Sequence, residues 1–371
     1  MGGRMRSRVL FIVVLLASTI LVTCGHDNGR GTPVPTIMTV GQPQSDTVVR
    51  LGFNDYAAAV TPGALYKISI TSPTDDTDLL VFGADSTYSV LAPCAINNTS
   101  IIGTSPEDCI MTAPGSTLYF SVDGTYLASG AATYVIDIEL LTETHLTLQT
   151  PFSDSTTQRS AVVYTVPVSS GTAYTIGMTG LSDDADLVVF GNDNTFTAPT
   201  TCSTDNTRFI GTTPEDCTWT SSAGTLYFIV DGIFSSAPVV QYTVLATPAP
   251  VVPVPTNEGS PGSPVPLSLD TPITGQVAHS GTSFYAVSGL TVGTRYTVSI
   301  LGLTGNANLT VFGSDSTFTT PASCLIDNTH FTGTTPEDCT LVASASTLYF
   351  TAAANTTSGG VAYINLVEPG P

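Results

Sequence analysis

The chain carries GTSPEDC at residues 103–109 and repeats it as GTTPEDC at residues 211–217 and 333–339. A second cysteine lies fifteen positions before the last residue of each motif, at Cys94, Cys202 and Cys324. Further upstream, each copy has a related stretch: DTDLLV at 76–81, DADLVV at 184–189 and NANLTV at 306–311. A spacing that recurs three times belongs to a folded unit, so the sequence predicts three copies of one domain.

Short stretches of each copy alternate apolar and polar residues. In the first copy, Tyr66, Ile68 and Ile70 are separated by Lys67 and Ser69, and the pattern recurs at 174–178 and 296–300. Such alternation, with β-branched and aromatic residues, is typical of half-buried strands. No stretch after residue 22 keeps a helical period, and 33 glycines and 25 prolines interrupt the chain at strand-length intervals. We therefore expect an all-β fold of the sandwich type.

Composition and alignment of the copies set the expected domain boundaries. Three copies of about 100 residues fit the usual size of a domain, and we place them at residues 38–146, 147–246 and 267–371. Residues 247–266 are Pro-rich. Such a linker is extended, so we expect the third domain to move independently of the first two. The first two domains follow each other without a linker and are expected to form a semi-rigid pair.

The order of motifs carries a family resemblance. Asp-x-Asp-Leu-x-Val, then a cysteine, then Glu-x-Cys and Thr-Leu-Tyr-Phe, resembles the bacterial pre-peptidase C-terminal (PPC) domain. The resemblance implies three tandem jelly-roll-like β-sandwiches of a kind that is appended to secreted peptidases and occurs in other exported proteins. Two features depart from the family. Leu80, Val188 and Thr310 stand where the family often has Tyr, and the peptidase itself is missing.

The N-terminal segment predicts export. Arg4, Arg6 and Arg8 precede an apolar run at residues 9–22, which has the length of a signal peptide and is short for a membrane span. The run ends in Leu-Val-Thr-Cys at residues 21–24, which resembles a bacterial lipobox, although the family usually has Ala, Gly or Ser in place of Thr23. We therefore expect a signal peptide at residues 1–23, lipidation of Cys24 and a flexible tether at residues 24–37.

An ordinary secretory signal and an uncleaved anchor are the alternatives to lipidation. Gly25, rather than Asp, follows the cysteine, and in bacteria with two membranes this resembles the default for transfer to the outer membrane. The expected location is therefore the bacterial cell envelope, with membrane attachment through the N-terminal lipid.

The cysteine count agrees with an exported protein. Of seven cysteines, six fall into the repeated pairs and Cys24 alone remains. Export favours disulfides, and closing a loop of this length stabilises a domain by about 3 kcal/mol in the chain-entropy model. A metal site is the competing interpretation, but none of the four histidines occupies a matching place in all three copies. The expected disulfides are Cys94–Cys109, Cys202–Cys217 and Cys324–Cys339.

Acidic residues cluster in the first two copies. Oxygen-rich clusters suit calcium, and Glu107, Asp108, Glu215 and Asp216 lie in the neighbouring motif, so calcium is the one cofactor that the sequence suggests. The alternative is structural: the Asp residues cap turns, and Pro-Glu-Asp caps a short helical turn. The third copy has Asn306 and Asn308 instead, which retain the ability to cap a turn. The candidate calcium ligands are Asp75, Asp76, Asp78, Asp183, Asp184 and Asp186.

The sequence argues against catalysis and nucleic-acid binding. It has no H-E-x-x-H, G-x-S-x-G or phosphate-loop motif, and its histidines, at positions 26, 145, 279 and 330, read as isolated surface residues. With 29 acidic against 9 basic residues, the formal net charge is −20, which repels phosphate backbones. We therefore expect a protein that is not an enzyme and that does not bind nucleic acid.

Aromatic residues supply the remaining candidate contacts. Trp219 is the one tryptophan and aligns with Met111 and Leu341, which predicts a core position rather than a binding platform. Tyr126 and Phe234 follow Val-Asp-Gly turns, where a loop tip presents them to a ligand.

Three functions remain open at this point. The leading one is multivalent binding of an extracellular polysaccharide or protein, because tandem copies raise avidity for a repetitive target. The alternatives are a structural spacer or scaffold of the cell envelope, and an accessory subunit of a secreted peptidase.

Overall fold

A computed structural model describes residues 34–250, 258–356 and 360–370 of the chain. The predicted signal peptide, Cys24 and most of the tether lie outside these residues. The described residues form strands, turns and bends, and none of them forms a helix that is long and apolar enough to span a membrane. The all-β prediction is therefore confirmed.

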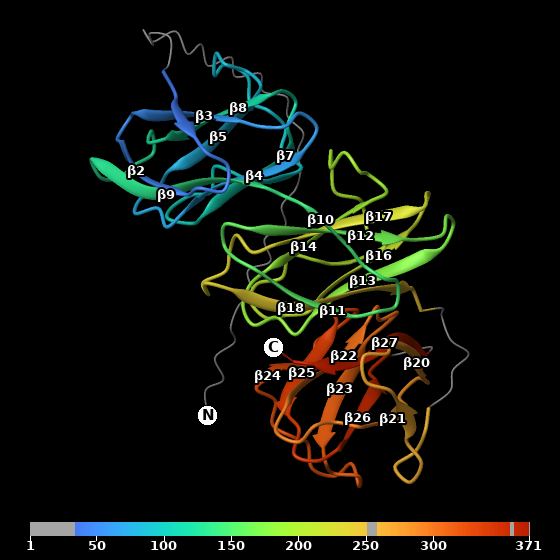
Figure 1. Cartoon of the computed structure of the whole chain (residues 1–371). Coiled ribbons are helices and arrows are strands. Elements are labelled where there is room, and N and C mark those ends of the chain that lie inside the picture. Colours follow the sequence, from blue (N-terminus) through green and yellow to red (C-terminus); the bar gives the residue numbers. More distant parts are fainter. Residues whose placement is uncertain (1–33, 251–257, 357–359, 371) are drawn as a thin grey trace. The chain divides into compact units, whose positions relative to one another are not determined.

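The first domain consists of two sheets that face each other across a core (Figure 1). The four-stranded sheet runs in the order β1 (Thr36–Met38), β3 (Phe53–Ala59), β8 (Thr117–Asp123), β5 (Asp78–Gly83). The five-stranded sheet runs in the order β2 (Gln44–Val49), β9 (Ala131–Leu140), β4 (Leu65–Thr71), β7 (Glu107–Thr112), β6 (Ile96–Asn98). Neighbouring strands are antiparallel, except that β1 pairs with β3 in parallel.

The second domain repeats this arrangement. Its four-stranded sheet contains β10 (Glu143–His145), β12 (Ala161–Pro167), β17 (Thr225–Asp231) and β14 (Asp186–Gly191). Its five-stranded sheet contains β11 (Phe152–Thr156), β18 (Val240–Pro248), β13 (Ala173–Thr179), β16 (Glu215–Thr220) and β15 (Thr204–Asn206).

The third domain has the same two sheets. The four-stranded sheet contains β19 (Val265–Leu267), β21 (Thr282–Ser288), β26 (Thr347–Ala354) and β23 (Ala307–Gly313). The five-stranded sheet contains β20 (Ile273–Val277), β27 (Val361–Pro369), β22 (Arg295–Leu301), β25 (Glu337–Val342) and β24 (Ile326–Asn328). Three tandem β-sandwiches of one topology confirm the repeat that the motifs predict.

Strand pairing shifts the expected boundaries by a few residues. The first domain was expected to start at residue 38, but β1 begins at Thr36. His145 was placed in the first domain, whereas β10 pairs with β12 of the second. The Pro-rich stretch 247–266 was expected to be linker throughout, but Pro248 ends β18 and Val265 begins β19. β1, β10 and β19 are each only 3 residues long, which is too short for a period to be recognised.

Each domain contains one disulfide at the predicted positions. Cys94–Cys109, Cys202–Cys217 and Cys324–Cys339 each have a Cα–Cα distance of 5.4 Å. The second cysteine of each pair is fully buried and is part of its domain's core. Disulfides of this kind are typical of proteins that fold in an oxidising, extracytoplasmic environment.

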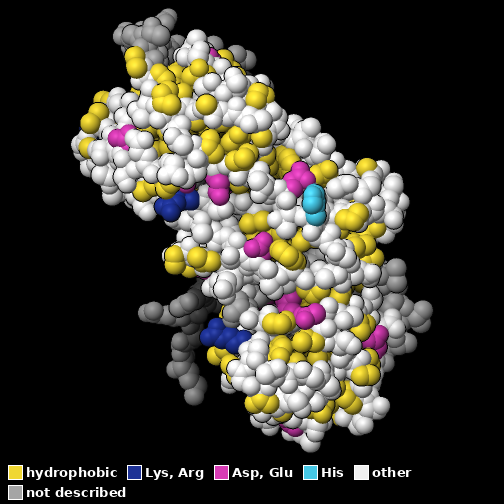
Figure 2. All heavy atoms as spheres, in the orientation of Figure 1, with side chains coloured by type: hydrophobic (Ala, Val, Ile, Leu, Met, Phe, Trp, Pro, Cys, Tyr) yellow, Lys and Arg dark blue, Asp and Glu magenta, His cyan; other side chains and the backbone are white. Residues whose placement is uncertain are grey.

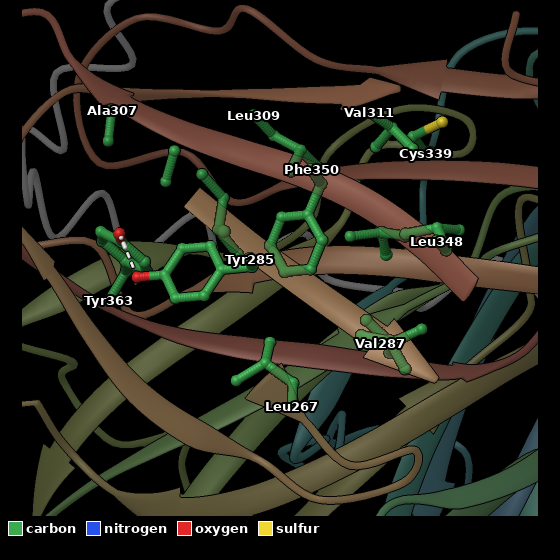
Figure 3. Close-up of a cluster of buried hydrophobic side chains, with 14 of the residues drawn as sticks. Leu267, Tyr285, Val287, Ala307, Leu309, Val311, Cys339, Leu348, Phe350 and Tyr363 are labelled. Carbon is green, nitrogen blue, oxygen red and sulfur yellow. Dashed lines mark hydrogen bonds between the residues drawn. The ribbon is translucent and has the colours of Figure 1, made fainter. Parts of the chain in front are cut away.

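A hydrogen-bonded tyrosine pair lies in the core of every domain. The hydroxyl oxygens are 2.6 Å apart in Tyr56–Tyr134, 2.9 Å in Tyr164–Tyr242 and 2.8 Å in Tyr285–Tyr363 (Figure 3). The first tyrosine of each pair also donates to a carboxylate, which is Asp46, Asp154 or Glu258. These triads satisfy hydroxyl groups that burial would otherwise leave unpaired.

The third domain obtains its triad carboxylate from a different place. Asp46 and Asp154 lie opposite the second tyrosine of their pairs, but Gly275 occupies this position in β20. A Cβ atom on Gly275 would come within 2.7 Å of the Tyr285 hydroxyl. Glu258 reaches the same hydroxyl from the end of the linker, at 2.8 Å. The linker therefore supplies the acid that the strand lacks.

Candidate functional site

A cleft of about 440 Å³ brings together two groups of residues that the sequence presents separately. Asp186, the first residue of β14, and Asp184, which precedes this strand, line the same cleft as Phe234, which follows β17. We call this the Phe234 cleft. Its lining residues are Asn98, Asp184, Asp186, Arg208, Phe209, Ile210 and Phe234.

Buried hydrogen bonds hold the walls of the Phe234 cleft. Glu215, the first residue of β16, accepts a hydrogen bond from the Leu187 amide at 2.7 Å and one from the Phe209 amide at 2.6 Å. One side chain thus ties β14 to the loop that carries Phe209 and Ile210. Phe234 sits on a tight turn in which Asp231 accepts a hydrogen bond from the Ile233 amide. Ile233 is buried, so Phe234 points outward and is 38% exposed.

The cleft combines exposed apolar side chains with two carboxyl groups. Ile210 is 90% exposed. Burial raises the pKa of Asp186 to about 7, with the nearby Asp231 and Asp184 adding to the shift and Arg208 opposing it. Burial also raises the pKa of Asp184, whose Oδ1 has no hydrogen-bond partner among the described residues. The cleft therefore holds two carboxyl groups with raised pKa values and an exposed aromatic side chain.

The equivalent end of the first domain has a similar set of residues. Tyr126 is 65% exposed, as the loop position predicts. Burial, with the neighbouring Asp76 and Asp123, raises the pKa of Asp78 to about 6. Asp76 accepts a hydrogen bond from the Gly103 amide at 2.8 Å. The Phe234 cleft differs because Asn98 of the first domain contributes to it.

Two of the candidate calcium ligands cap turns. Asp75 accepts hydrogen bonds from the Ser129 and Asp76 amides. The Ser129 hydroxyl, together with these two amides, holds the pKa of Asp75 well below its usual range. Asp183 accepts from the Ala237 amide and from the Ser236 hydroxyl. Among the described residues, no group of three or more His, Cys, Asp or Glu side chains is placed to hold a metal ion. Calcium binding stays a prediction.

The expectation of a short helical turn at Pro-Glu-Asp is wrong. Glu107, Glu215 and Glu337 are the first residues of β7, β16 and β25, and all three are fully buried. Each accepts hydrogen bonds from backbone amides, at Leu79, Leu187 and Leu309 among others. Each glutamate therefore satisfies backbone amides, as a helix cap does, but here it connects two strands at the end of the sandwich.

The outer face of β4 shows why the half-buried strand prediction also fails. All seven residues of this strand are buried, including Lys67, Ser69 and Thr71. The second domain covers this face: Leu65, Ile96 and Ile110 of the first domain share an apolar cluster with Val163, Phe190 and Ile229 of the second. We call this contact the first seam.

A buried ion cluster lies in the first seam. Lys67 Nζ is 2.5 Å from Asp231 Oδ1 and 3.1 Å from Asp108 Oδ2, and it donates to the Ser160 carbonyl at 3.3 Å. The Lys67 side chain is 0% exposed. Asp108 Oδ1 accepts from the side-chain Nδ2 of Asn98 at 2.8 Å. The sequence gives no sign of this cluster, because Lys67 stands at an alternating position that reads as solvent-facing.

A second seam joins the second and third domains through the outer faces of their five-stranded sheets. Leu245 packs with Leu301, Ile364 and Leu366 in a buried cluster. The Gly180 amide donates to Asp338 at 2.9 Å, and at the equivalent positions the Gly302 amide donates to Asp216 at 2.6 Å. The reciprocal bonds give this seam an approximate twofold symmetry. It differs from the expectation that the third domain moves independently.

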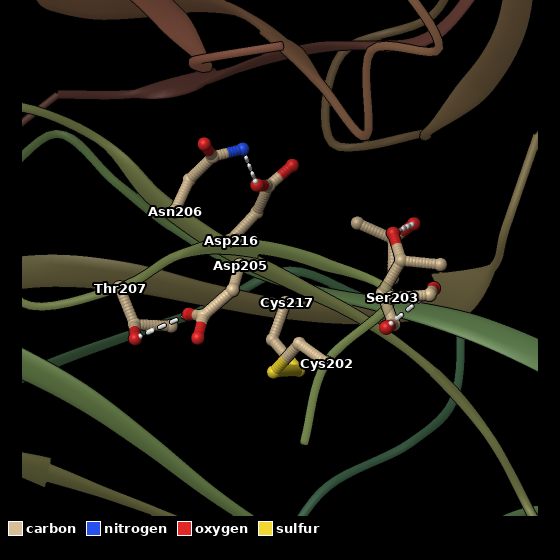
Figure 4. Close-up of a disulfide and its surroundings, with 9 residues drawn as sticks. Cys202, Ser203, Asp205, Asn206, Thr207, Asp216 and Cys217 are labelled. Atoms are coloured by element: carbon tan, nitrogen blue, oxygen red, sulfur yellow. Dashed lines mark hydrogen bonds between the residues drawn. A yellow bond between two sulfur atoms is a disulfide. The ribbon is translucent and has the colours of Figure 1, made fainter. Parts of the chain in front are cut away.

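The carboxylates of the second seam are fully buried. Asp216 also accepts from Asn206 at 2.7 Å, beside the Cys202–Cys217 disulfide (Figure 4). Burial raises the pKa of Asp216 to about 7, of Asp338 to about 6 and of Glu368 to about 8. Glu368 accepts from the Thr179 hydroxyl at 2.8 Å.

The remaining sequence candidates lie elsewhere. Trp219 is partly buried and packs against the core of the second domain, as predicted. His145 Nδ1 is 2.5 Å from the Thr165 hydroxyl oxygen in β12. Lys and Arg side chains occupy little of the face drawn in Figure 2, in keeping with the acidic composition.

Comparison with known proteins leaves the family open. No protein-family model matches the chain, and no curated protein does. Similar solved structures include the CUB1-EGF-CUB2 domains of rat MASP-1, with 8% identity, 60% of this chain and 99% of that chain covered, and a TM-score of 0.19. A structure of Sulfolobus turreted icosahedral virus has 14% identity, 88% and 89% coverage and a TM-score of 0.19. Scores this low carry no inference about function.

Proposed function

We propose that the protein is a non-catalytic component of a bacterial cell envelope that binds an extracellular polysaccharide or protein through its tandem PPC-like β-sandwiches. The observation that carries the proposal is the Phe234 cleft, where the exposed side chains of Phe234 and Ile210 line the same cleft as Asp184 and Asp186. Ligand sites are concave and combine apolar walls with a few polar groups, and this cleft has both.

Membrane attachment is the second part of the proposal. The lipobox-like sequence ending at Cys24 supports a lipid anchor, in the outer membrane if the bacterium has one. The three disulfides support an exported location. A Cys24→Ala variant is expected to leave the membrane fraction of cells. Retention of this variant in the membrane fraction would contradict the lipid anchor.

The binding test compares two loop-tip variants of a soluble fragment, residues 27–371. Wild-type fragment is expected to be retained, saturably, on one of four insoluble polymers: peptidoglycan, cellulose, chitin or collagen. Removing a ring that contributes about 2 kcal/mol to binding raises the Kd about 30-fold, so Phe234→Ala is expected to lose retention. Tyr126→Ala removes the equivalent exposed ring from the first domain, so the comparison shows whether binding depends on the Phe234 cleft alone or on the equivalent rings of both domains.

Each outcome distinguishes the candidate functions. Loss of retention in Phe234→Ala, with an unchanged melting temperature, supports the cleft. Equal retention of both variants and wild type would contradict the Phe234 cleft as the binding site. Retention on none of the polymers favours a structural spacer or scaffold, a function supported by the two buried seams, which use the outer faces of all three five-stranded sheets.

A further inference from the structure

The chain contains a single lysine, Lys67, among 371 residues. Lysine is almost never fully buried in proteins unless it is paired, yet this one is 0% exposed. At the equivalent position the second and third domains have Thr175 and Thr297, which make ordinary hydroxyl hydrogen bonds to Thr218 and Thr340. The lysine is therefore not required by the sandwich fold, and its role lies in the first seam.

The Lys67 amine lies within hydrogen-bonding distance of a carboxyl group of another domain. Its Nζ lies 2.5 Å from Asp231 Oδ1, and Asp231 ends β17 of the second domain with 1% of its side chain exposed. A second carboxyl group, Asp108, lies 3.1 Å from the same nitrogen and is also fully buried. One amine and two acids thus share a site from which water is excluded.

We propose that Lys67 and Asp231 form an isopeptide bond that joins the first domain to the second. Three observations support the proposal: the contact between Nζ and the carboxyl oxygen, the complete burial of both partners, and the presence of Asp108 beside the reacting nitrogen. Burial favours the product, because an amide carries no charge whereas the ion pair keeps two charges out of water.

The step balances without any co-reactant. One proton moves from the Lys67 ammonium to the Asp231 carboxylate, which gives a neutral amine and a carboxylic acid. The amine nitrogen attacks Asp231 Cγ, and the C–N bond forms as the C–OH bond breaks. Asp108 accepts the proton that the nitrogen loses and returns a proton to the departing hydroxyl, so one water is released. Asp108 begins and ends the step as a carboxylic acid.

The surroundings of Asp108 suit this proton transfer. Burial raises the pKa of Asp108 well above its ordinary value, with the nearby Asp231 adding to the shift and Lys67 opposing it. The side-chain Nδ2 of Asn98 donates to Asp108 Oδ1, which leaves Oδ2 directed at Lys67 Nζ. The charged groups of neighbouring strands that also act on this site are Asp137, Glu139, Arg159 and Asp186.

The single lysine makes the test simple. A lysine-specific protease has one site in the whole chain, and it cuts only after a lysine with a free amine. Full-length protein is purified, denatured, reduced and treated with this protease. If the isopeptide bond is present, the wild-type chain is expected to stay intact, and peptide mass spectrometry is expected to find residues 67 and 231 joined with the loss of one water. Complete cleavage of wild-type protein into two fragments would overturn the proposal.

Two variants assign the partners. Asp231→Ala removes the acceptor and is expected to give complete cleavage after Lys67. Asp108→Asn keeps a hydrogen-bonding side chain but cannot return a proton, and it is expected to be cleaved to the same extent while retaining the native circular dichroism spectrum. An uncleaved Asp231→Ala chain would overturn the choice of Asp231, and an uncleaved Asp108→Asn chain would overturn the role of Asp108. The wild-type result requires neither variant to fold.

Discussion

Leu301 gives the sharpest test of the second seam. Its side chain is 1% exposed and packs with Leu245 of the second domain. In β13, a Cβ atom on Gly177 would come within 2.9 Å of Leu301 Cδ1, so the leucine fills the space that the glycine leaves. Truncating a buried leucine to alanine costs about 2–5 kcal/mol, through lost burial and the cavity that remains. For Leu301 much of this cost falls on the contact between domains.

Hydrogen exchange measures the opening of the second seam directly. The Gly180 and Gly302 amides donate to Asp338 and Asp216 across the seam, so each exchanges when the seam opens. A loss of about 2–5 kcal/mol corresponds to an increase in exchange of about 30-fold to several thousand-fold. Leu301→Ala is expected to accelerate both amides by the same factor, because one opening event exposes both.

Leu309→Ala is the matched control, since Leu309 lies in the core of the third domain rather than at the seam. This variant is expected to accelerate exchange throughout β23, whereas Leu301→Ala leaves β23 protected. Unchanged exchange at Gly180 and Gly302 in Leu301→Ala would refute the seam as a source of stability. Different factors at the two amides would refute a single opening event.

Three further predictions concern stability. Replacing Cys324 and Cys339 by alanine is expected to lower the free energy of unfolding of the third domain by about 3 kcal/mol, measured by urea unfolding under non-reducing conditions; an unchanged value would contradict the disulfide's role. Glu258→Ala leaves the Tyr285 hydroxyl without its carboxylate and is expected to cost about 1–3 kcal/mol, with Asp270→Ala, a partly exposed acid of the same domain, as the control. The pKa values of Asp216, Asp338 and Glu368 are raised to about 7, 6 and 8. Their protonated forms are thus favoured in the folded chain, and stability of the seam is expected to be full near pH 4 and to fall as pH rises to about 8. Urea unfolding across this range checks the sign, and stability that rises with pH would contradict it.

Particular residues show what sequence reasoning recovered. The constant spacing within each cysteine pair predicted the disulfides, because the length of the loop that a disulfide closes can be read directly from the sequence. Exposure of Tyr126 and Phe234 followed from their place after tight turns. The prediction of a helical turn at Glu107 was wrong because Pro-Glu-Asp can begin either a helix or a strand. Only the pairing of β7 with β4 shows that a strand begins here.

By itself, the sequence determined the number of domains, the strand-rich fold and the disulfide pairs, because repetition, period and spacing are local properties of the chain. Only the tertiary structure decided which faces are covered. It placed Lys67 between two acids of different domains, joined Phe234 to Asp184 and Asp186 in one cleft, and brought Glu258 to the site that Gly275 leaves empty. Each of these contacts links residues that are far apart in the chain, and alternation of polar and apolar residues carries no record of which domain packs against a polar face.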